Sequence, residues 1–142
     1  MFDLNNILRE NIKKLVPYSS ARDEYKGTAG IFLDANENAF GSPVDMEVEG
    51  QELKLNRYPD TLQIAVKEKL GKIKGLTIEN IFLGNGSDEA IDIIFRAFCN
   101  PGKDNAIICP PTYGMYEVSA NINDVKCIKV PLLPETFQLN AD

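Results

Sequence analysis

Apolar residues near the start of the chain recur at spacings of three and four, which predicts an amphipathic helix over about residues 4–15. Pro17 ends this pattern. The long segment that follows is rich in Gly, Pro, Ser, Asn and acids, and we interpret its one short apolar run, at 31–33, as a short strand within an extended arm. A second amphipathic pattern predicts a helix over about residues 62–70, closed by Gly71–Gly75.

From residue 81 onward, short apolar runs alternate with helical patterns. The runs predict strands at 81–83, 106–109 and 125–131, and the segments between them predict helices at 87–98 and 113–122. Strands and helices that alternate over short links are typical of βαβ units. We therefore expect an α/β fold with an open, mostly parallel sheet that carries helices on both faces.

Composition and charge narrow the classes of function. The chain has 142 residues, 44% of them hydrophobic and 25% charged, so a globular protein is expected rather than a disordered one. Acids outnumber bases by 21 to 15, which argues against nucleic-acid binding, because that affinity comes mostly from Lys and Arg at phosphates. The apolar stretches fall short of the roughly 20 residues that a spanning helix needs, so we expect no membrane attachment.

Two residue types limit the chemistry. The sequence has no histidine, which excludes a Ser-His-Asp triad, a Cys-His pair and most zinc sites within it, and we expect no metal. The cysteines Cys99, Cys109 and Cys127 are far apart and form no CxxC pair. We therefore expect a cytoplasmic protein whose thiols serve as small core residues.

The sharpest local motif is Gly-Asn-Gly-Ser-Asp-Glu-Ala at 84–90, where a predicted strand turns into a helix. Free backbone N–H groups at a helix start attract anions, and glycines let an anion come close, so the motif favours a phosphate. The dinucleotide fingerprint does not fit, because Glu89 stands at the third glycine position of GxGxxG, and no GxxxxGK[ST] is present. A tight turn with an ordinary Ser87 cap explains the same residues, and the local sequence offers an anion no cation.

Three further motifs carry candidate side chains. Tyr113 lies in Pro-Pro-Thr-Tyr-Gly-Met-Tyr at 110–116, after a predicted strand and at the sheet edge where α/β proteins gather ligands. Its ring would present a face to a flat ligand, and packing over the strand end is an equal alternative. The polar groups at 33–38 also fit a solvated turn, and Asn-Arg-Tyr-Pro-Asp at 56–60 also fits a helix entry.

In their order and spacing these motifs resemble the histidinol-phosphate aminotransferase family of pyridoxal-phosphate enzymes. The matching stretches span nearly the whole chain, at 17–22, 33–38, 57–60, 84–91, 96–99 and 110–116. The resemblance implies the beginning of an aspartate-aminotransferase-like large domain (PLP fold type I) over 59–142, preceded over 1–58 by a helix and an extended arm on the dimer and substrate side. It also implies a homodimeric transaminase that moves an amino group between L-histidinol phosphate and 2-oxoglutarate in histidine biosynthesis.

The resemblance assigns cofactor contacts to particular residues. The backbone amides around Gly86, Ser87 and Asp88 would hold the phosphate of pyridoxal 5'-phosphate, in agreement with the argument from the helix start. Tyr113 would stack on the pyridine ring. Tyr58 would reach across a dimer interface to the phosphate of the partner's cofactor.

On the substrate side, the resemblance places Tyr18 and Asn36 near the small-molecule amino-acid substrate, with Tyr18 close to its phosphate end. The lysine that binds the cofactor covalently stands beyond Asp142 in this family, so no catalytic residue is expected in the chain itself. We therefore expect an N-terminal fragment that is inactive alone. The acidic Gly41–Leu55 segment departs from the family as a longer insertion.

Two alternatives stay open. A related enzyme of the same fold would act on another amino acid, as an aromatic aminotransferase or a threonine-phosphate decarboxylase does. A non-catalytic, truncated phosphate-binding fragment would bind the cofactor only without a covalent bond.

Overall fold

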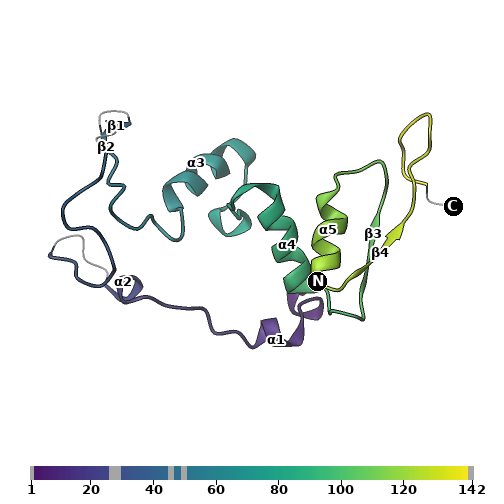
Figure 1. Cartoon of the computed structure of the whole chain (residues 1–142), viewed down its shortest axis with the longest axis horizontal. Coiled ribbons are helices and arrows are strands. Elements are labelled where there is room, and N and C mark those ends of the chain that lie inside the picture. Colours follow the sequence, from purple (N-terminus) through teal and green to yellow (C-terminus); the bar gives the residue numbers. More distant parts are fainter. Residues whose placement is uncertain (1, 26–29, 45–46, 49–50, 141–142) are drawn as a thin grey trace. The chain divides into compact units, whose positions relative to one another are not determined.

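The structure is a computed structural model that describes most of the chain, over residues 2–25, 30–44, 47–48 and 51–140. The chain forms two compact units. One unit combines the segment up to Val16 with the segment from Gly84 onward, and the other is Pro17–Leu83. Figure 1 labels the helices and strands of both units.

Two helices lie side by side in the first unit, α4 over Gly86–Phe98 and α5 over Met115–Ile122 (Figure 1). The carboxylate of Asp92 in α4 joins them, because it accepts a hydrogen bond at 2.8 Å from Nδ2 of Asn123, the residue that ends α5. Within α4 the same carboxylate also accepts a hydrogen bond from Arg96 Nε at 2.6 Å. Both helices confirm the predictions from the apolar pattern.

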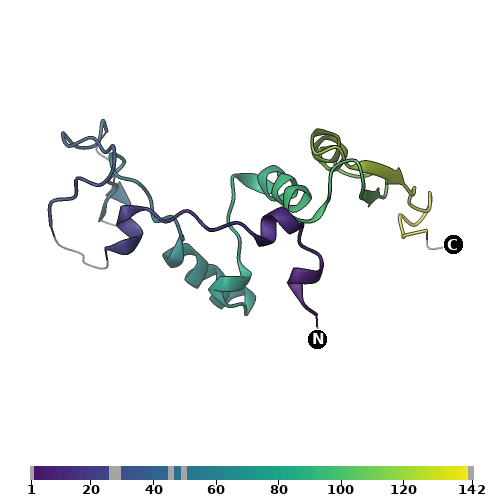
Figure 2. The same cartoon turned by 90° about the horizontal axis from the view of Figure 1, so that it is seen from below.

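The first unit also contains a parallel strand pair, β3 over Asn105–Ile108 and β4 over Lys126–Lys129. Parallel strands need a crossover connection, and α5 supplies it. In the turned view of Figure 2, α5 lies against the strand pair. The β3–α5–β4 unit confirms the predicted strands at 106–109 and 125–131 and the predicted α/β character, with β4 shorter than expected.

The core of this unit lies where α4, α5 and the two strands meet. Its most buried members are Phe95, Ala120 and Val125, of which Ala120 has no exposed surface. Cys99 and Cys127 pack against this cluster from the end of α4 and from β4. On the alternate positions of the strands, side chains such as Ile107 are exposed, as the two-residue period of a strand requires.

The segment before Pro17 departs from the predicted single helix over 4–15. It forms a 3-10 turn, η1 over Leu4–Asn6, and a short helix, α1 over Glu10–Lys13, with extended backbone at Arg9 between them. The reason lies at the C-terminal end of α4. The Arg9 backbone N–H donates to Ala97 O at 3.0 Å and Arg9 Nη1 donates to Arg96 O at 2.7 Å, and these bonds satisfy carbonyls that the helix end leaves unpaired.

In the second unit the main helix is α3, over Ile64–Lys74, followed by the 3-10 turn η2 over Ile78–Asn80. The helix was predicted over about 62–70 and closed by Gly71–Gly75; it continues to Lys74 and ends at Gly75, the last residue of that closing segment, whose φ of +67° suits glycine. Gly71 is buried within the helix. A larger residue would not fit there, because its Cβ would lie 2.6 Å from Leu76 O. It serves close packing, not helix termination.

The remaining elements of the second unit are the short helix α2 over Ala21–Glu24 and an antiparallel pair, β1 over Glu47–Val48 and β2 over Gln51–Glu52. The pair was not predicted. It falls inside the acidic Gly41–Leu55 segment, of which residues 45–46 and 49–50 lie outside the described part of the chain.

Two predicted strands are wrong. The runs at 31–33 and 81–83 form no strand, and no strand pairs with either run in the described part of the chain. Ile31 and Leu33 are about nine-tenths exposed, so the first run has neither a ladder nor a packed face. Apolar and β-branched residues favour a strand only where pairing and burial reward them.

Candidate functional site

The start of α4 presents donors that suit an anion. Gly86 has a φ of +78°, which glycine adopts without strain. Apart from its chain neighbours and the backbone of its own helix, no described atom lies within 4 Å of the position that a Cβ would occupy. The side chain of the N-cap residue Asn85 makes no hydrogen bond to the first turn. The Gly86 N–H donates to Gly84 O at 3.0 Å. The N–H groups from Ser87 onward in the first turn have no partner within the helix by its geometry, and Ser87 itself is exposed. The first turn therefore offers several N–H donors and a hydroxyl.

Two acids of the same turn point to other partners. Glu89 Oε2 accepts a hydrogen bond from the backbone N–H of the N-cap residue Asn85 at 2.5 Å. Asp88 is partly buried, and among the described residues its Oδ1 is buried without a hydrogen-bond partner. A buried carboxylate oxygen without a donor is costly, so Asp88 is a natural acceptor for a group that enters the site.

Tyr113 lies next to this helix start. Its hydroxyl is 3.4 Å from Asp88 Oδ2, and its ring meets the Tyr116 ring edge to face, with centroids 6.2 Å apart. The hydrogen bond to Asp88, with the Asp88 charge, raises the pKa of the Tyr113 phenol above its ordinary value. Just over half of the Tyr113 surface is exposed, so its ring has room for a ligand.

The structure thus brings together four of the predicted site residues, Gly86, Ser87, Asp88 and Tyr113. They lie beyond the end of β3, which stops at Ile108 and is followed by the turn that carries Tyr113. This is the carboxyl end of a parallel strand, where open α/β sheets bind ligands.

The other three predicted residues, Tyr18, Asn36 and Tyr58, belong to the second unit. All are exposed, with Tyr18 at 90% and Tyr58 at 64% of their full surface. The backbone N–H of Tyr58 donates to Glu37 Oε1 at 2.8 Å, so Tyr58 is joined to the loop that carries Asn36. Tyr18 takes no part in this link.

A network of charged residues in the second unit was not predicted. We call it the Glu37 network, formed by Arg22, Asp34, Glu37 and Arg57. Arg22 binds Asp34 through two hydrogen bonds of 2.6 and 2.7 Å, and Arg57 Nη1 lies 2.7 Å from Glu37 Oε2. The Glu37 side chain is only 4% exposed.

Electrostatics within the Glu37 network favour the charged forms. The hydrogen bond from Arg57, then the Tyr58 N–H, hold the pKa of Glu37 below its usual range. The hydrogen bond from Arg22 likewise lowers the pKa of Asp34, and the pKa of the Arg22 guanidinium is raised in return. Nothing in the local sequence marks these pairs, because their partners stand 12 to 21 residues apart.

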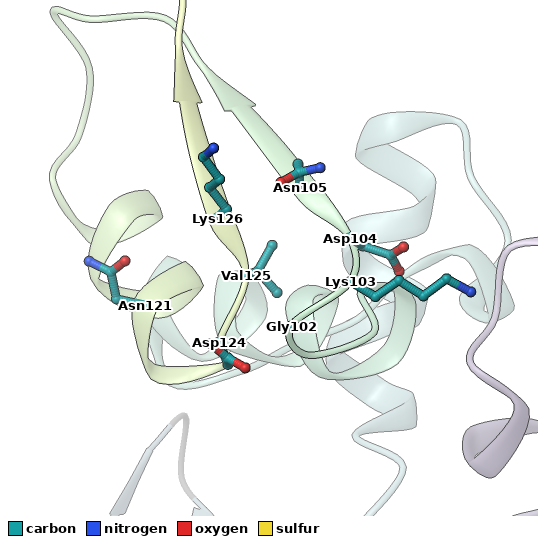
Figure 3. Close-up of a pocket in the computed structure, with 8 residues that line it drawn as sticks. All are labelled: Gly102, Lys103, Asp104, Asn105, Asn121, Asp124, Val125 and Lys126. Carbon is teal, nitrogen blue, oxygen red and sulfur yellow. The ribbon is translucent and has the colours of Figure 1, made fainter.

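A shallow pocket of about 350 Å³ lies elsewhere in the first unit, between the Gly102 turn and the segment around Asp124 (Figure 3). Asn105 and Lys126 line it at the beginnings of β3 and β4, as Figure 3 shows. No predicted site residue borders it. This pocket lies at the amino ends of β3 and β4, whereas ligands of α/β sheets bind at the carboxyl ends of strands. We therefore assign the candidate site to the α4 start and not to this pocket.

The described residues form neither a metal-binding cluster nor a membrane-spanning helix. No group of three or more Cys, Asp or Glu side chains in that part of the chain is arranged to hold a metal ion. None of the helices described is long and apolar enough to cross a membrane.

Comparison with known proteins points to one family. The family model described as aminotransferase class I and II matches residues 28–142. The histidinol-phosphate aminotransferase of Cytophaga hutchinsonii is 60% identical over 141 residues, which cover 99% of this chain and 38% of that protein. The proteins of the same name from Parabacteroides distasonis and Schizosaccharomyces pombe are each 51% identical over all of this chain, and the match covers 38% and 37% of them. The chain thus spans a little over a third of the length of these curated relatives.

Proposed function

We propose, since this chain belongs to the class I and II aminotransferase family, that it contributes the phosphate-binding side of a pyridoxal-phosphate-dependent transaminase. The substrate pair in this proposal is L-histidinol phosphate and 2-oxoglutarate, within histidine biosynthesis. The observation that carries it is identity of 51 to 60% over almost the whole chain to relatives named histidinol-phosphate aminotransferase. The arrangement at the α4 start supports the same conclusion independently.

The fold in this proposal is the beginning of a PLP fold type I large domain over 59–142, with the N-terminal helix and arm over 1–58 on the dimer and substrate side. The parallel β3–α5–β4 unit supports it, since such a domain is built from parallel strands joined by helices. In this proposal further strands extend the pair into an open, mostly parallel sheet with helices on both faces.

The residues at the α4 start fit the phosphate of the cofactor. Gly86 leaves open space, and the first-turn N–H groups with the Ser87 hydroxyl form a donor set suited to a doubly charged oxyanion. The helix dipole adds a favourable partial positive charge there. Glu89 leaves these donors free, because its carboxylate is turned back to Asn85.

Tyr113 would hold the ring of the cofactor by stacking. Its hydroxyl donates to Asp88 Oδ2 at 3.4 Å, which keeps the ring beside the α4 start. Bound pyridoxal phosphate supplies an electron sink that stabilises negative charge on the amino-acid carbon. The described residues of the chain bind and orient that group.

On the substrate side, Tyr18 and Asn36 would contact the small-molecule amino donor, with Tyr18 at its phosphate end. Tyr58 would reach the phosphate of the cofactor held by a second copy, which makes the homodimer part of the proposal. The large exposure of Tyr18 and Tyr58 supports these roles, since both phenols are available for contacts outside their own unit. A cytoplasmic location follows from the pathway.

The test is an amino-donor profile of the full-length protein. With 2-oxoglutarate as acceptor, we expect kcat/KM for L-histidinol phosphate to exceed that for phenylalanine by at least about 100-fold, because a site built around a phosphate leaves buried donors unpaired when the phosphate is missing. Histidinol without its phosphate is the matched control and should be a poor donor. Preference for phenylalanine, or release of carbon dioxide from threonine phosphate, would refute the proposed substrate.

A further inference from the structure

Glu37 lies at a point where two loops of the second unit meet. Its side chain is 4% exposed, although the loop that carries it is largely at the surface. One carboxylate oxygen, Oε1, accepts the backbone N–H of Tyr58 at 2.8 Å. The other, Oε2, lies 2.7 Å from Arg57 Nη1 and 3.5 Å from Arg22 Nη2.

These contacts hold the Arg57–Tyr58 segment by both its side chain and its backbone. A neighbouring bond, from Asn56 Nδ2 to the backbone oxygen of Asn38 at 2.8 Å, ties the same two loops together. Arg22 in turn is fixed by Asp34, and its guanidinium lies over the Phe32 ring at 4.7 Å from the centroid. Charge-assisted bonds of this kind are stronger than neutral ones and define geometry.

The Tyr58 side chain itself is 64% exposed, so no core packing of its own unit fixes its direction. Its backbone N–H is held by Glu37, and the position of the backbone sets where the Cα–Cβ bond starts and which rotamers are allowed. The direction of the Tyr58 phenol thus depends on Glu37, although Glu37 holds the backbone N–H of Tyr58 and not its phenol.

We propose that Glu37 is a positioning residue that directs the Tyr58 phenol toward the phosphate of pyridoxal phosphate. This inference rests on the proposed function, because it uses the role given there to Tyr58. Arg57 supports Glu37 from the side opposite the backbone bond.

The experiment is a double-mutant cycle in the full-length protein, read as the Kd of pyridoxal phosphate for the cofactor-free form, by absorbance or fluorescence titration. Glu37→Leu keeps a similar size but removes both acceptor oxygens, so the Tyr58 N–H and the Arg57 side chain both lose their partner. We expect Glu37→Leu and Tyr58→Phe each to raise Kd by about tenfold, and the double variant to stay within about twofold of Tyr58→Phe. Asp34→Asn is the matched control, since it breaks a pair with Arg22 but leaves the Tyr58 bond, and its Kd should change less than about twofold.

The outcomes separate the two ideas. Additive effects, with the double variant near about 100-fold, would mean that Glu37 acts independently of Tyr58 and would overturn the inference alone. An unchanged Kd in Glu37→Leu would overturn it as well. No effect of Tyr58→Phe would remove the proposed role of Tyr58 and the inference with it, while the donor profile judges the reaction separately. If Glu37→Leu does not fold, Arg57→Gln weakens the same carboxylate from its other side, and its cycle with Tyr58→Phe is judged by the same criteria.

Discussion

Ser87 stands where a hydroxyl and free backbone N–H groups converge on one position, at the exposed start of α4. If a phosphate binds there, removal of the hydroxyl loses a hydrogen bond to a charged group, which is worth about 1.5–3 kcal/mol. We expect Ser87→Ala to raise the Kd of pyridoxal phosphate by roughly tenfold or more. Titration with pyridoxal, which lacks the phosphate, is the control, and its Kd should not change. Equal weakening of both ligands would show that Ser87 does not face the phosphate.

Asp88 and Tyr113 form a second pair at residue scale. Because the hydrogen bond and charge of Asp88 raise the pKa of the Tyr113 phenol, we expect Asp88→Asn to lower that pKa toward its ordinary value of about 10. The measurement is an alkaline titration of tyrosinate absorbance. The same titration of Tyr113→Phe identifies which part of the curve belongs to this phenol. A curve unchanged by Asp88→Asn would mean that the two side chains do not interact in solution.

At the scale of elements, Asp60 caps the start of α3. Its Oδ1 accepts the Leu62 N–H at 3.0 Å and its Oδ2 accepts the Ile64 N–H at 2.8 Å, and these bonds lower the pKa of Asp60. The pKa of Asp60 is therefore lower in the folded protein than in the unfolded chain. The stability that the charged cap adds to the fold is complete above about pH 4 and is lost as the pH falls through the folded pKa.

We therefore expect Asp60→Ala to cost about 1 kcal/mol at pH 7, in line with the loss of other helix caps, and to cost less as the solution becomes acidic. The measurement is the free energy of unfolding by denaturant at pH 7 and near pH 3. Asp60→Asn is the matched control, because it keeps one acceptor but cannot titrate. A cost that does not depend on pH would exclude the charged cap.

The elements that could be predicted are those whose signal is local. The helices α4 and α5 and the strands β3 and β4 follow from apolar periods that agree with the contacts they make. The predicted helix over 4–15 failed because Arg9 bonds to carbonyls far along the chain, and the strands at 31–33 and 81–83 failed because a strand needs a partner.

The same division holds for the candidate site. The place of Gly86 and Ser87 at a helix start could be predicted, because a turn that leads into a helix is encoded in consecutive residues. The role of Glu37 could not be predicted, because its partners Arg57 and Tyr58 stand 20 and 21 positions away. Its side chain is also only 4% exposed, although the polar residues around it in the sequence suggest an exposed turn. The binding roles assigned to the residues at the α4 start and to Tyr113, Tyr18, Asn36 and Tyr58 all stay predictions.

At the scale of the whole molecule, the proposed dimer can be tested by mixing two inactive variants of the full-length protein. Tyr58→Ala would inactivate the site of the partner copy. Gly86→Val would inactivate the site of the copy that carries it, because valine does not adopt a φ of +78° without strain. In a mixed dimer one site then carries both defects and the other carries none.

Free exchange of equal amounts makes half of the dimers mixed, each with one intact site of two, so we expect recovery of about a quarter of the wild-type transaminase activity. The measurement is activity after the two variants are mixed under conditions that let subunits exchange. Each variant mixed with itself is the control. Recovery no greater than in those controls would mean that Tyr58 serves its own subunit.

The packing of Cys99 and Cys127 against the Phe95–Val125 cluster has a practical consequence. Desolvation by burial, with a smaller contribution from Asp104 at Cys99 and from Glu117 at Cys127, raises the pKa of both thiols, so little of the reactive thiolate is present at neutral pH. Both side chains are still partly exposed, so we expect alkylation at neutral pH to proceed, but more slowly than at a fully exposed cysteine. The rate at which each thiol is labelled therefore reports on the packing around it, at the end of α4 for Cys99 and on β4 for Cys127.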